Sequence, residues 1–389
     1  MDIVTIKEDK YFEAVRLSEY AFQYNIPKDE VNERIEQMKK HHQVIGVVED
    51  EKLIAKLHFL PFEVFIGEKK ITMGGIAGVA TYPEYRRKGL VKGMLTHILE
   101  KMKTEGYLVS MLYPFSVPFY REYGWELFAN RLSVSIKKSD LRFQSESLGR
   151  IKRFSDSLPI SNLNRIYEHY AKGFTGMLVR KEDWWEKIGK NTHIAMFFDD
   201  ANEPKGYIMY TVKEKKMKVG EFIALNSEAR RGLWNYICQH DSMIEDLEMI
   251  VDEREPLLFS LHEPRVKMET TPYFMARLVD VEEFLKQSTF TWNSIDNDVV
   301  LQVKDEYAPW NNQTFLLKKG AVTVLDTREL EERKARVIHL SINTLSAILL
   351  GYKRPLELME IGKVTGSEES IRAFEDLAPR NKPFFYDFF

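Results

Sequence analysis

Residues 79–91 read VATYPEYRRKGLV, and this stretch decides how the first third of the chain folds. The apolar run that ends near Thr81 is typical of a strand, and Tyr82-Pro83 is typical of a turn. From Gly89 onward, apolar residues recur every three or four positions, which predicts a helix. Three consecutive cations therefore stand between a strand and the first turn of a helix.

Cations are unusual at that end of a helix. The first backbone N–H groups of a helix lack partners there, and the helix dipole adds partial positive charge. Arg86, Arg87 and Lys88 therefore predict an anionic ligand, for which a diphosphate is the natural candidate. Gly89 would let that ligand approach the backbone closely. The alternative is a solvated basic turn. The sequence contains neither a GxxxxGK[ST] loop nor a dinucleotide-binding fingerprint.

The segments around this stretch predict a mixed α/β domain. Residues 11–40 favour helix, interrupted at Pro27, and the helix after Gly89 should stop at Gly106. Short apolar runs separated by turn residues favour antiparallel strands. The expected strands are 44–48, 53–59, 62–66, 70–73, 74–81 and 107–113. We place this first domain at residues 1–145.

Later segments predict two further domains. Residues 141–160 are polar and suit a linker. Strands at 194–198, 206–211 and 220–225, followed by Arg230-Arg231-Gly232 and a helix, repeat the order of the first domain, so residues 146–285 are expected to be a diverged copy. The remainder, residues 286–389, forms a third domain. Its expected elements are strands at 299–303, 314–318 and 321–324 and a helix at 342–350.

The end of the chain is strongly aromatic, since four of the last six residues are phenylalanine. Each such ring would expose about 150–250 Å² if it were left free. We therefore expect the tail, together with the carboxylate of Phe389, to be buried against another part of the protein.

Composition excludes several classes of protein. The chain of 389 residues carries 56 basic and 59 acidic residues, a net charge of −3, so no basic field would hold nucleic acid. A single cysteine, Cys238, excludes a disulfide within one chain and a zinc site built from cysteines. No metal is expected. Without an apolar leader or a run of about 18 apolar residues, a cytoplasmic protein with no membrane span is predicted.

Two motifs resemble a known family. Arg86-x-x-Gly89-x-Val91 resembles the coenzyme A pyrophosphate loop of the GNAT acetyltransferases, although Val91 is larger than the family's glycine or alanine. Residues 112–126, LYPFSVPFYREYGWE, resemble the tyrosine and glycine segment of Eis-type (enhanced intracellular survival) N-acetyltransferases. Those proteins join two GNAT domains to a sterol-carrier-protein-like domain. The resemblance therefore implies α/β architecture, with tandem GNAT acyltransferase domains and a C-terminal sterol-carrier-like domain.

The resemblance implies acetyl-CoA as co-substrate. The side chains of Arg86 and Arg87 and the backbone that follows them would hold the pyrophosphate. The backbone of the preceding strand would pair with the pantetheine arm, like an added strand. The residues assigned to acetyl-CoA are Val79, Ala80, Thr81, Arg86, Arg87, Lys88, Gly89, Leu90 and Ser116. The second domain, which lacks the tyrosine and glycine segment, is expected to bind none.

Two catalytic groups are also implied. Tyr120 matches the family's general acid, which returns a proton to the leaving thiolate. A core aromatic role is the alternative for Tyr120, and Tyr123 is the competing choice of acid. The C-terminal carboxylate of Phe389 would lie in the active site, either as the base or as the group that orients a cationic amine.

The implied function is acetyl transfer from acetyl-CoA to a primary amine by direct attack. The acceptors would be polycations such as aminoglycosides, or lysine side chains. A homo-oligomer, such as a hexamer, is implied as well. The alternative is a non-catalytic protein that binds acyl-CoA or lipid.

Overall fold

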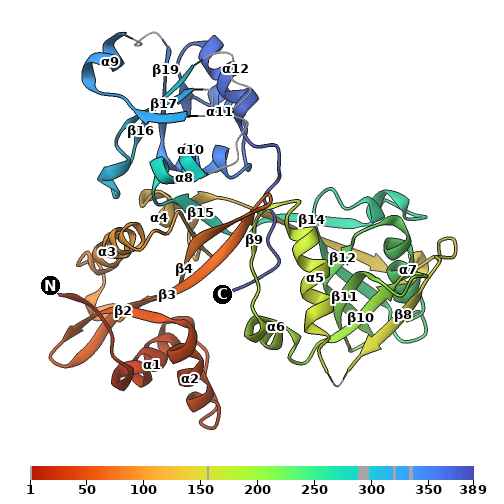
Figure 1. Cartoon of the computed structure of the whole chain (residues 1–389). Coiled ribbons are helices and arrows are strands. Elements are labelled where there is room, and N and C mark those ends of the chain that lie inside the picture. The colour runs from red at the N-terminus through yellow and green to blue at the C-terminus, as the bar shows by residue number, and fades with distance from the viewer. Residues whose placement is uncertain (1, 156, 288–297, 319–320, 333–335) are drawn as a thin grey trace.

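The computed structural model describes residues 2–155, 157–287, 298–318, 321–332 and 336–389. These residues form three β-sheets with helices packed on them (Figure 1). No helix in the described ranges is long and apolar enough to cross a membrane.

The first sheet carries the predicted motifs. Its strand order is β1-β2-β3-β4-β5-β15-β6, and β9 pairs with β3. The strands are β1 (Ile3–Thr5), β2 (Gln43–Glu49), β3 (Lys52–Ile66), β4 (Lys69–Thr81), β5 (Val109–Leu112), β6 (Glu126–Leu127), β9 (Thr175–Leu178) and β15 (Met275–Leu278). The helices are α1 (Tyr11–Phe22), α2 (Val31–His41), α3 (Leu90–Thr104) and α4 (Val117–Glu122).

Successive side chains of β3 point to opposite faces of this sheet. Leu57 and Phe59 pack in the core that α3 covers. Lys56 and His58 point to the other face, where Lys56 contacts Ser18 of α1. The face of α1 and α2 is thus partly polar in its interior, whereas the face of α3 is apolar.

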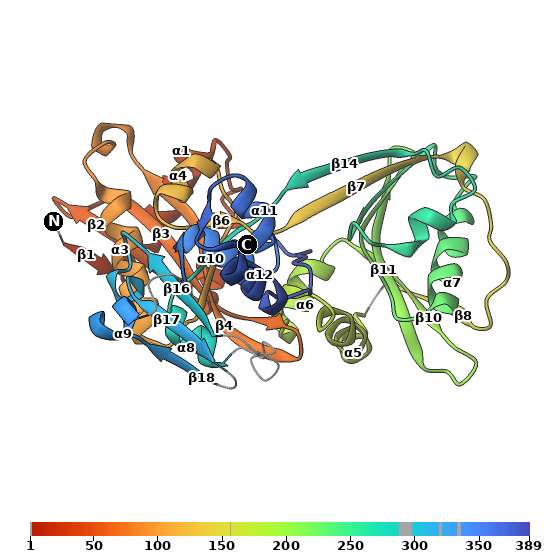
Figure 2. The ribbon, with the colours of Figure 1, turned by 90° about the horizontal axis from the view of Figure 1, so that it is seen from above.

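The second sheet forms a separate lobe, with the order β14-β7-β13-β12-β11-β10-β8. Figure 2 shows β7 and β14 running from the first part of the molecule to this lobe. The strands are β7 (Asn130–Lys137), β8 (Arg150–Phe154), β10 (His193–Phe198), β11 (Pro204–Lys213), β12 (Lys216–Ala224), β13 (Asp246–Val251) and β14 (Lys267–Pro272). The helices are α5 (Ile160–Ala171), α6 (Glu182–Gly189) and α7 (Ser227–Cys238).

The third sheet has the order β18-β17-β16-β19-β20. Its core is continuous with part of the core of the first sheet, since Met111 and Phe128 belong to the same hydrophobic cluster as Leu301 and Ile348. The strands are β16 (Val299–Lys304), β17 (Thr314–Lys318), β18 (Ala321–Val324), β19 (Val337–Ser341) and β20 (Val364–Thr365). The helices are α8 (Val281–Gln287), α9 (Thr327–Glu332), α10 (Ile342–Leu349), α11 (Pro355–Glu360) and α12 (Glu368–Leu377).

Most predicted elements are confirmed, with two differences of continuity. The strands expected at 53–59 and 62–66 are one strand, β3, and those expected at 70–73 and 74–81 are one strand, β4. The linker expected at 141–160 is wrong in part, because β8 lies inside it and pairs with β10. β8 is an edge strand with mostly exposed, charged side chains, so its composition resembles that of a linker.

The sheets exchange strands across the predicted boundary between residues 145 and 146. β7 precedes that position but lies in the second sheet, and β15 follows it but lies in the first. The two lobes are therefore linked through their sheets as well as through the chain. The boundaries of the three domains themselves stay predictions.

The C-terminal tail passes between the first sheet and α6 (Figure 1). Backbone hydrogen bonds join Thr175 of β9 to Lys382 (3.1 Å) and Phe384 (3.2 Å). The predicted burial is confirmed for Phe384 and Phe385, whereas Phe388 is 58% exposed and Phe389 is half-buried.

Candidate active site

The predicted site lies where the paired strands β4 and β5 separate. They pair in parallel only from Met73–Val109 to Ile76–Leu112. Beyond Ile76, β4 continues to Thr81 with β3 on one side, and no described strand pairs with its other side. The backbone of residues 77–81 can therefore accept an extended ligand as an additional strand.

A β-bulge shapes this free edge. Ala77 pairs with His58 and Ala80 with Lys56, so two residues of β4 stand opposite one residue of β3. Gly78 in the bulge has a φ of +53°, and a Cβ there would come within 2.8 Å of His58 Cδ2. Only glycine fits both the backbone conformation and the space.

The loop after β4 carries the three cations at the surface. Arg86, Arg87, Lys88 and Gly89 are all exposed. Arg87 and Gly89 have φ values of +62° and +76°, and Gly89 is the N-cap residue of α3. A Cβ at Gly89 would meet nothing within 4 Å, so its φ, and not crowding by neighbours, calls for glycine.

The N-terminus of α3 is open to a ligand. No side chain caps this 15-residue helix within the described part of the chain, and its first residue, Leu90, is buried in the core. Arg86 donates from Nε to the carbonyl oxygen of Thr81 (3.3 Å), which ties the loop to the end of β4. The exposed loop therefore brings two guanidinium groups and an ammonium group next to the unpaired N–H groups of a helix start, an arrangement suited to a diphosphate.

Thr81 gives a second indication that a ligand binds at this edge. Its Oγ1 is buried and has no hydrogen-bond partner among the described residues. Buried hydroxyl groups are normally paired, so an unpaired one at a free strand edge suggests a ligand that completes it. Val79 is half-buried and Ala80 is buried at the same edge.

Tyr120 lies on α4, which follows β5 and begins after Ser116. The ring is buried against Phe115, Phe119 and Trp125, at centroid distances of 5.4, 5.1 and 6.4 Å. Burial raises the pKa of Tyr120 because the phenolate would lose its hydration. The phenol therefore stays protonated and can donate a hydrogen bond.

Tyr123, the competing choice, has a structural environment. Its ring packs on Tyr307 of the third domain at 4.8 Å, and its carbonyl oxygen accepts a hydrogen bond from the buried Arg277. This position at the domain contact favours a packing role for Tyr123 and leaves Tyr120 as the better candidate for the acid.

The last residue of the chain lies against the first sheet. The ring of Phe389 contacts Phe62 of β3 at 5.1 Å and Phe274 at 5.0 Å. A Cβ on Gly75 of β4 would come within 2.9 Å of the Phe389 ring. Phe389 thus packs on β4 three residues before the bulge. It lies on the face of the first sheet that α1 and α2 cover.

A buried ionic network fixes the tail in this place. Asp387 accepts hydrogen bonds from Arg180 Nε (3.0 Å) and Trp184 Nε1 (2.7 Å). Arg180 also pairs with Glu221, which accepts from the hydroxyl group of Tyr207 (2.8 Å). Sequence reasoning missed this network, because the charges that pair lie 41 and 207 positions apart.

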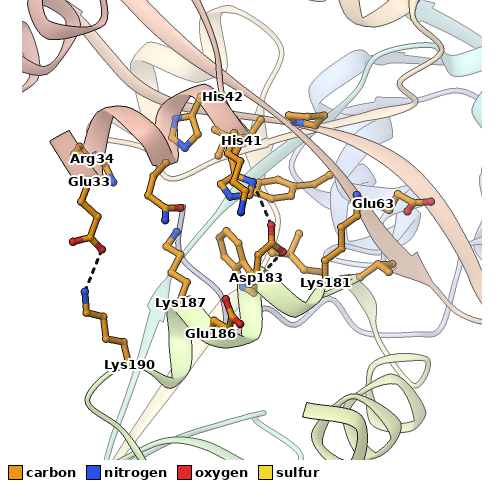
Figure 3. Close-up of a pocket in the computed structure, with 18 of the residues that line it drawn as sticks. Glu33, Arg34, His41, His42, Glu63, Lys181, Asp183, Glu186, Lys187 and Lys190 are labelled. Atoms are coloured by element: carbon orange, nitrogen blue, oxygen red, sulfur yellow. Dashed lines mark hydrogen bonds and ion pairs between the residues drawn. The ribbon is translucent and has the colours of Figure 1, made fainter. Parts of the chain in front are cut away.

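A cavity of about 1200 Å³ opens beside the tail, between α2 and α6. Figure 3 shows Glu33, Arg34 and His41 of α2 facing Asp183 and Lys187 of α6 across it. His41 pairs with Asp183 at 3.4 Å. Phe62, which contacts Phe389, also lines this cavity. The cavity is therefore a candidate for the acceptor side of the site.

The second domain does not reproduce the first site. Arg230 and Arg231 lie inside α7, where Arg230 pairs with Glu255 at 2.5 Å and Arg231 pairs with Glu228. The side chain of Asn226 already caps α7. These arginines are thus engaged within the protein, which supports a single coenzyme A site per chain.

No group of three or more metal-ligating side chains occurs within the described residues. The third domain has a hollow of about 800 Å³, whose mixed lining includes the polar residues Gln302, Asn312 and His339 and the apolar residues Val303, Leu325 and Leu340.

Three family models match the chain in succession. Acetyltransferase (GNAT) domain models match residues 2–128 and 176–278, and a sterol carrier protein domain model matches residues 281–386. The first GNAT match covers β1 to β6, and the second covers β10 to β14 together with β9 and β15, two strands that pair in the first sheet. Two GNAT matches in succession confirm the predicted repeat and the tandem architecture.

Known proteins agree with this assignment. An uncharacterized N-acetyltransferase of Streptomyces griseus is 25% identical over 80% of both chains. The N-acetyltransferase Eis of Mycobacterium tuberculosis is 23% identical over 61% of this chain and 63% of its own. Among solved structures, a probable N-acyltransferase of Enterococcus faecalis superposes with a TM-score of 0.91 at 25% identity, covering 100% of this chain and 99% of the other. Eis1 of Mycobacterium abscessus has the same fold, with a TM-score of 0.83 at 20% identity over the full length of both.

Proposed function

Because this chain belongs to the Eis-type N-acetyltransferases, with two GNAT domains and a C-terminal sterol-carrier-protein-like domain, we propose that its first domain is catalytic. The proposed reaction is transfer of acetyl from acetyl-CoA to a primary amine by direct attack. The observation that carries the proposal is the free edge of β4, which runs from the bulge at Gly78 into a cationic loop and the uncapped helix α3. The non-catalytic alternative is set aside, because two of the three matched models are acetyltransferase domains and the named relatives are N-acetyltransferases.

The residues present fit acetyl-CoA as a co-substrate. Arg86, Arg87 and Lys88 would neutralise the diphosphate, and the N–H groups at Gly89 and Leu90 would hydrogen-bond to it. The edge of β4 at Val79, Ala80 and Thr81 would pair with the amides of the pantetheine arm. Ser116, at the start of α4, would face the same opening between β4 and β5.

The transfer itself needs no covalent enzyme intermediate. The acceptor nitrogen attacks the thioester carbonyl, a C–N bond forms, and the C–S bond breaks with release of a thiolate. A thiol has a pKa of about 8.5, so its anion forms easily but must still be stabilised. The phenol of Tyr120 donates to the departing sulfur and recovers a proton from the nitrogen of the new amide.

The carboxylate of Phe389 is assigned to orienting the acceptor. A free α-carboxyl group has a pKa of about 3.3–3.7, so it is anionic at neutral pH and attracts an ammonium group. Serving as the base would require burial to raise that pKa strongly. The orienting role requires no shift of the pKa of this carboxyl group. The hydrogen bonds of Asp387 support that role because they fix the end of the chain.

The cavity beside the tail bears on the choice of acceptor. Its lining holds five acidic residues, Glu30, Glu33, Glu63, Asp183 and Glu186, and five basic residues, Arg34, Lys40, Lys181, Lys187 and Lys190. A polycation such as an aminoglycoside would be attracted to a surplus of acids. The balanced lining instead favours an amine within a molecule of mixed charge, such as a lysine side chain of a peptide.

Thiol release from acetyl-CoA tests this function directly. We expect the protein to release free thiol in the presence of lysine-containing peptides, with a weaker response to aminoglycosides. A mass increase of one acetyl group on the acceptor should accompany the release. Release no faster than spontaneous hydrolysis with every amine in a broad panel would refute the proposal.

Three further properties stay predictions: one acetyl-CoA per chain, a homo-oligomer such as a hexamer, and a cytoplasmic location. The engaged arginines of α7 support the first of these.

A further inference from the structure

A lysine without an acidic partner lies inside the first domain. Lys56 of β3 is fully buried, and no carboxylate among the described residues acts on its amino group, since burial and the charge of Arg34 are the influences on it. Its Nζ lies 2.7 Å from Ser18 Oγ and 2.6 Å from His58 Nε2. The Ser18 hydroxyl donates to the carbonyl oxygen of Ala14 (3.1 Å), so its oxygen accepts from Lys56.

Two histidines connect this lysine to the cavity. Nδ1 of His58 lies 2.9 Å from Nδ1 of His42, and the two rings meet edge to face at 5.1 Å. His42 follows the end of α2 and lines the cavity (Figure 3). An unbroken row of nitrogen atoms therefore leads from the cavity wall through His42 and His58 to Lys56.

The surroundings disfavour a charge on this row of side chains. Besides Lys56 itself, the charged or titratable groups that act on His42 are Arg34 and His41 from α2 and Lys187 from α6. Burial, reinforced by these groups, lowers the pKa of His42 to about 3. Burial likewise holds the pKa of His58 and of Lys56 well below their usual values. Lys56 is thus kept toward the neutral amine, which can accept a proton.

The row also lies at the reacting end of the site. A Cβ on Gly78 would come within 3.0 Å of Lys56 Nζ and within 2.8 Å of the His58 ring. The bulge that would present the thioester is therefore backed by these two side chains. Phe62, two alternations along β3 from His58, holds Phe389 on the same face.

We propose that His42, His58 and Lys56 form a proton relay that removes the proton of the acceptor ammonium group and stores it on Lys56. The proposal rests on the acetyl transfer proposed above. It assigns deprotonation to this row and leaves the Phe389 carboxylate to hold the ammonium group. An alkylamine of pKa about 10.4 is almost entirely protonated at pH 7, so such a base is needed.

The proton transfers balance through a change of tautomer. Before the reaction, His42 Nδ1–H donates to His58 Nδ1, and His58 Nε2–H donates to Lys56 Nζ. When His42 Nε2 takes a proton from the acceptor, each of these hydrogens moves one step inward. Both imidazoles end neutral in the opposite tautomer, and Lys56 becomes an ammonium group. The proton leaves by the reverse route once the acetylated product has departed.

A purely structural role explains the row less well. A buried base without an acidic partner generally destabilises a fold relative to an apolar side chain of similar size. The neighbouring positions on this face, Leu53 and Leu60, show that apolar residues are accommodated there.

The test compares Lys56→Met and His42→Gln with the wild type, using two acceptors with amine pKa values near 10 and below 7. At pH 7 we expect kcat/KM for the basic amine to fall about 100-fold in both variants, because the base is lost. The deficit should shrink toward pH 10, where the free amine is abundant. The weakly basic amine should be acetylated within about threefold of the wild-type rate throughout.

Equal losses with both amines at every pH, or unchanged profiles in folded variants, would overturn the relay. His97→Gln on α3, on the other face of the sheet, is the matched control and should change neither profile. If Lys56→Met does not fold, His42→Gln at the cavity wall decides the question. Calorimetric binding of acetyl-CoA should be unaltered in both variants.

Nitrogen-15 NMR of the wild type separates this proposal from the proposed function. Neutral His42 and His58 sharing an Nδ1–Nδ1 hydrogen bond at pH 7, with a neutral Lys56 amine, would support the relay even if the acceptor tested were wrong. A charged Lys56 at that pH would contradict the relay and leave acetyl transfer standing. Absence of thiol release by the wild type with every amine would instead contradict the transfer itself.

Discussion

Replacement of Tyr120 by phenylalanine is expected to lower kcat for acetyl transfer by roughly 10²- to 10⁴-fold, the usual contribution of a general acid. The ring would keep its contacts with Phe115, Phe119 and Trp125, so the fold should be preserved. Only the hydroxyl group that donates to the leaving sulfur is removed. Thiol release gives kcat, and calorimetry should show acetyl-CoA affinity within about twofold of the wild type.

Tyr123→Phe is the matched control for this experiment. Tyr123 lies three residues further on and packs on Tyr307 at the contact with the third domain. Its hydroxyl group has no assigned part in the transfer, so turnover should stay within a few-fold of the wild type. A Tyr120 variant with wild-type turnover, or a larger loss in the Tyr123 variant, would refute the assignment of the acid.

Extension of the chain beyond Phe389 is expected to abolish acetyl transfer without unfolding the protein. An added peptide converts the terminal carboxylate into an amide and places new atoms where the acceptor should bind. The tail should nevertheless remain docked, because Asp387, Arg180 and Trp184 hold it through bonds that do not involve the last residue. Turnover and the thermal unfolding midpoint of a variant with a few added glycines measure the two effects separately.

The same glycines added before Met1 provide the control for the extension and should leave turnover unchanged. Full activity in the C-terminally extended protein would contradict any role for the Phe389 carboxylate. A large fall in the unfolding midpoint would show that the loss of activity comes from undocking of the tail.

The features that could be predicted from the sequence are those formed by residues close together in the chain. Residues 79–91 contain a strand, a turn, three cations and a helix start in one continuous run, and the structure has these elements in that order. Gly106 follows α3 in the left-handed conformation typical of a glycine that ends a helix, as its position predicts. Tyr120 could be selected because its neighbours form a recognisable motif.

Longer-range features could not be predicted. Nothing near Lys56 indicates that its side chain is buried, since a lysine in a strand is ordinarily at the surface. His41-His42 resembles a surface pair, and only the pairing of β2 with β3 brings His42 to His58. The partnership of Arg180 with Glu221 and Asp387, and the exchange of β7 and β15 between sheets, likewise depend on contacts between distant segments.

Calorimetric titration of the protein with acetyl-CoA tests the central claim most directly. We expect saturable binding of one molecule per chain. Arg86→Glu should weaken this binding about 10- to 100-fold. Arg231→Gln should change it little, because the arginine at that position is paired with Glu228. Binding of two equivalent molecules would contradict the assignment to the first domain alone. No detectable association at millimolar acetyl-CoA would contradict the account as a whole.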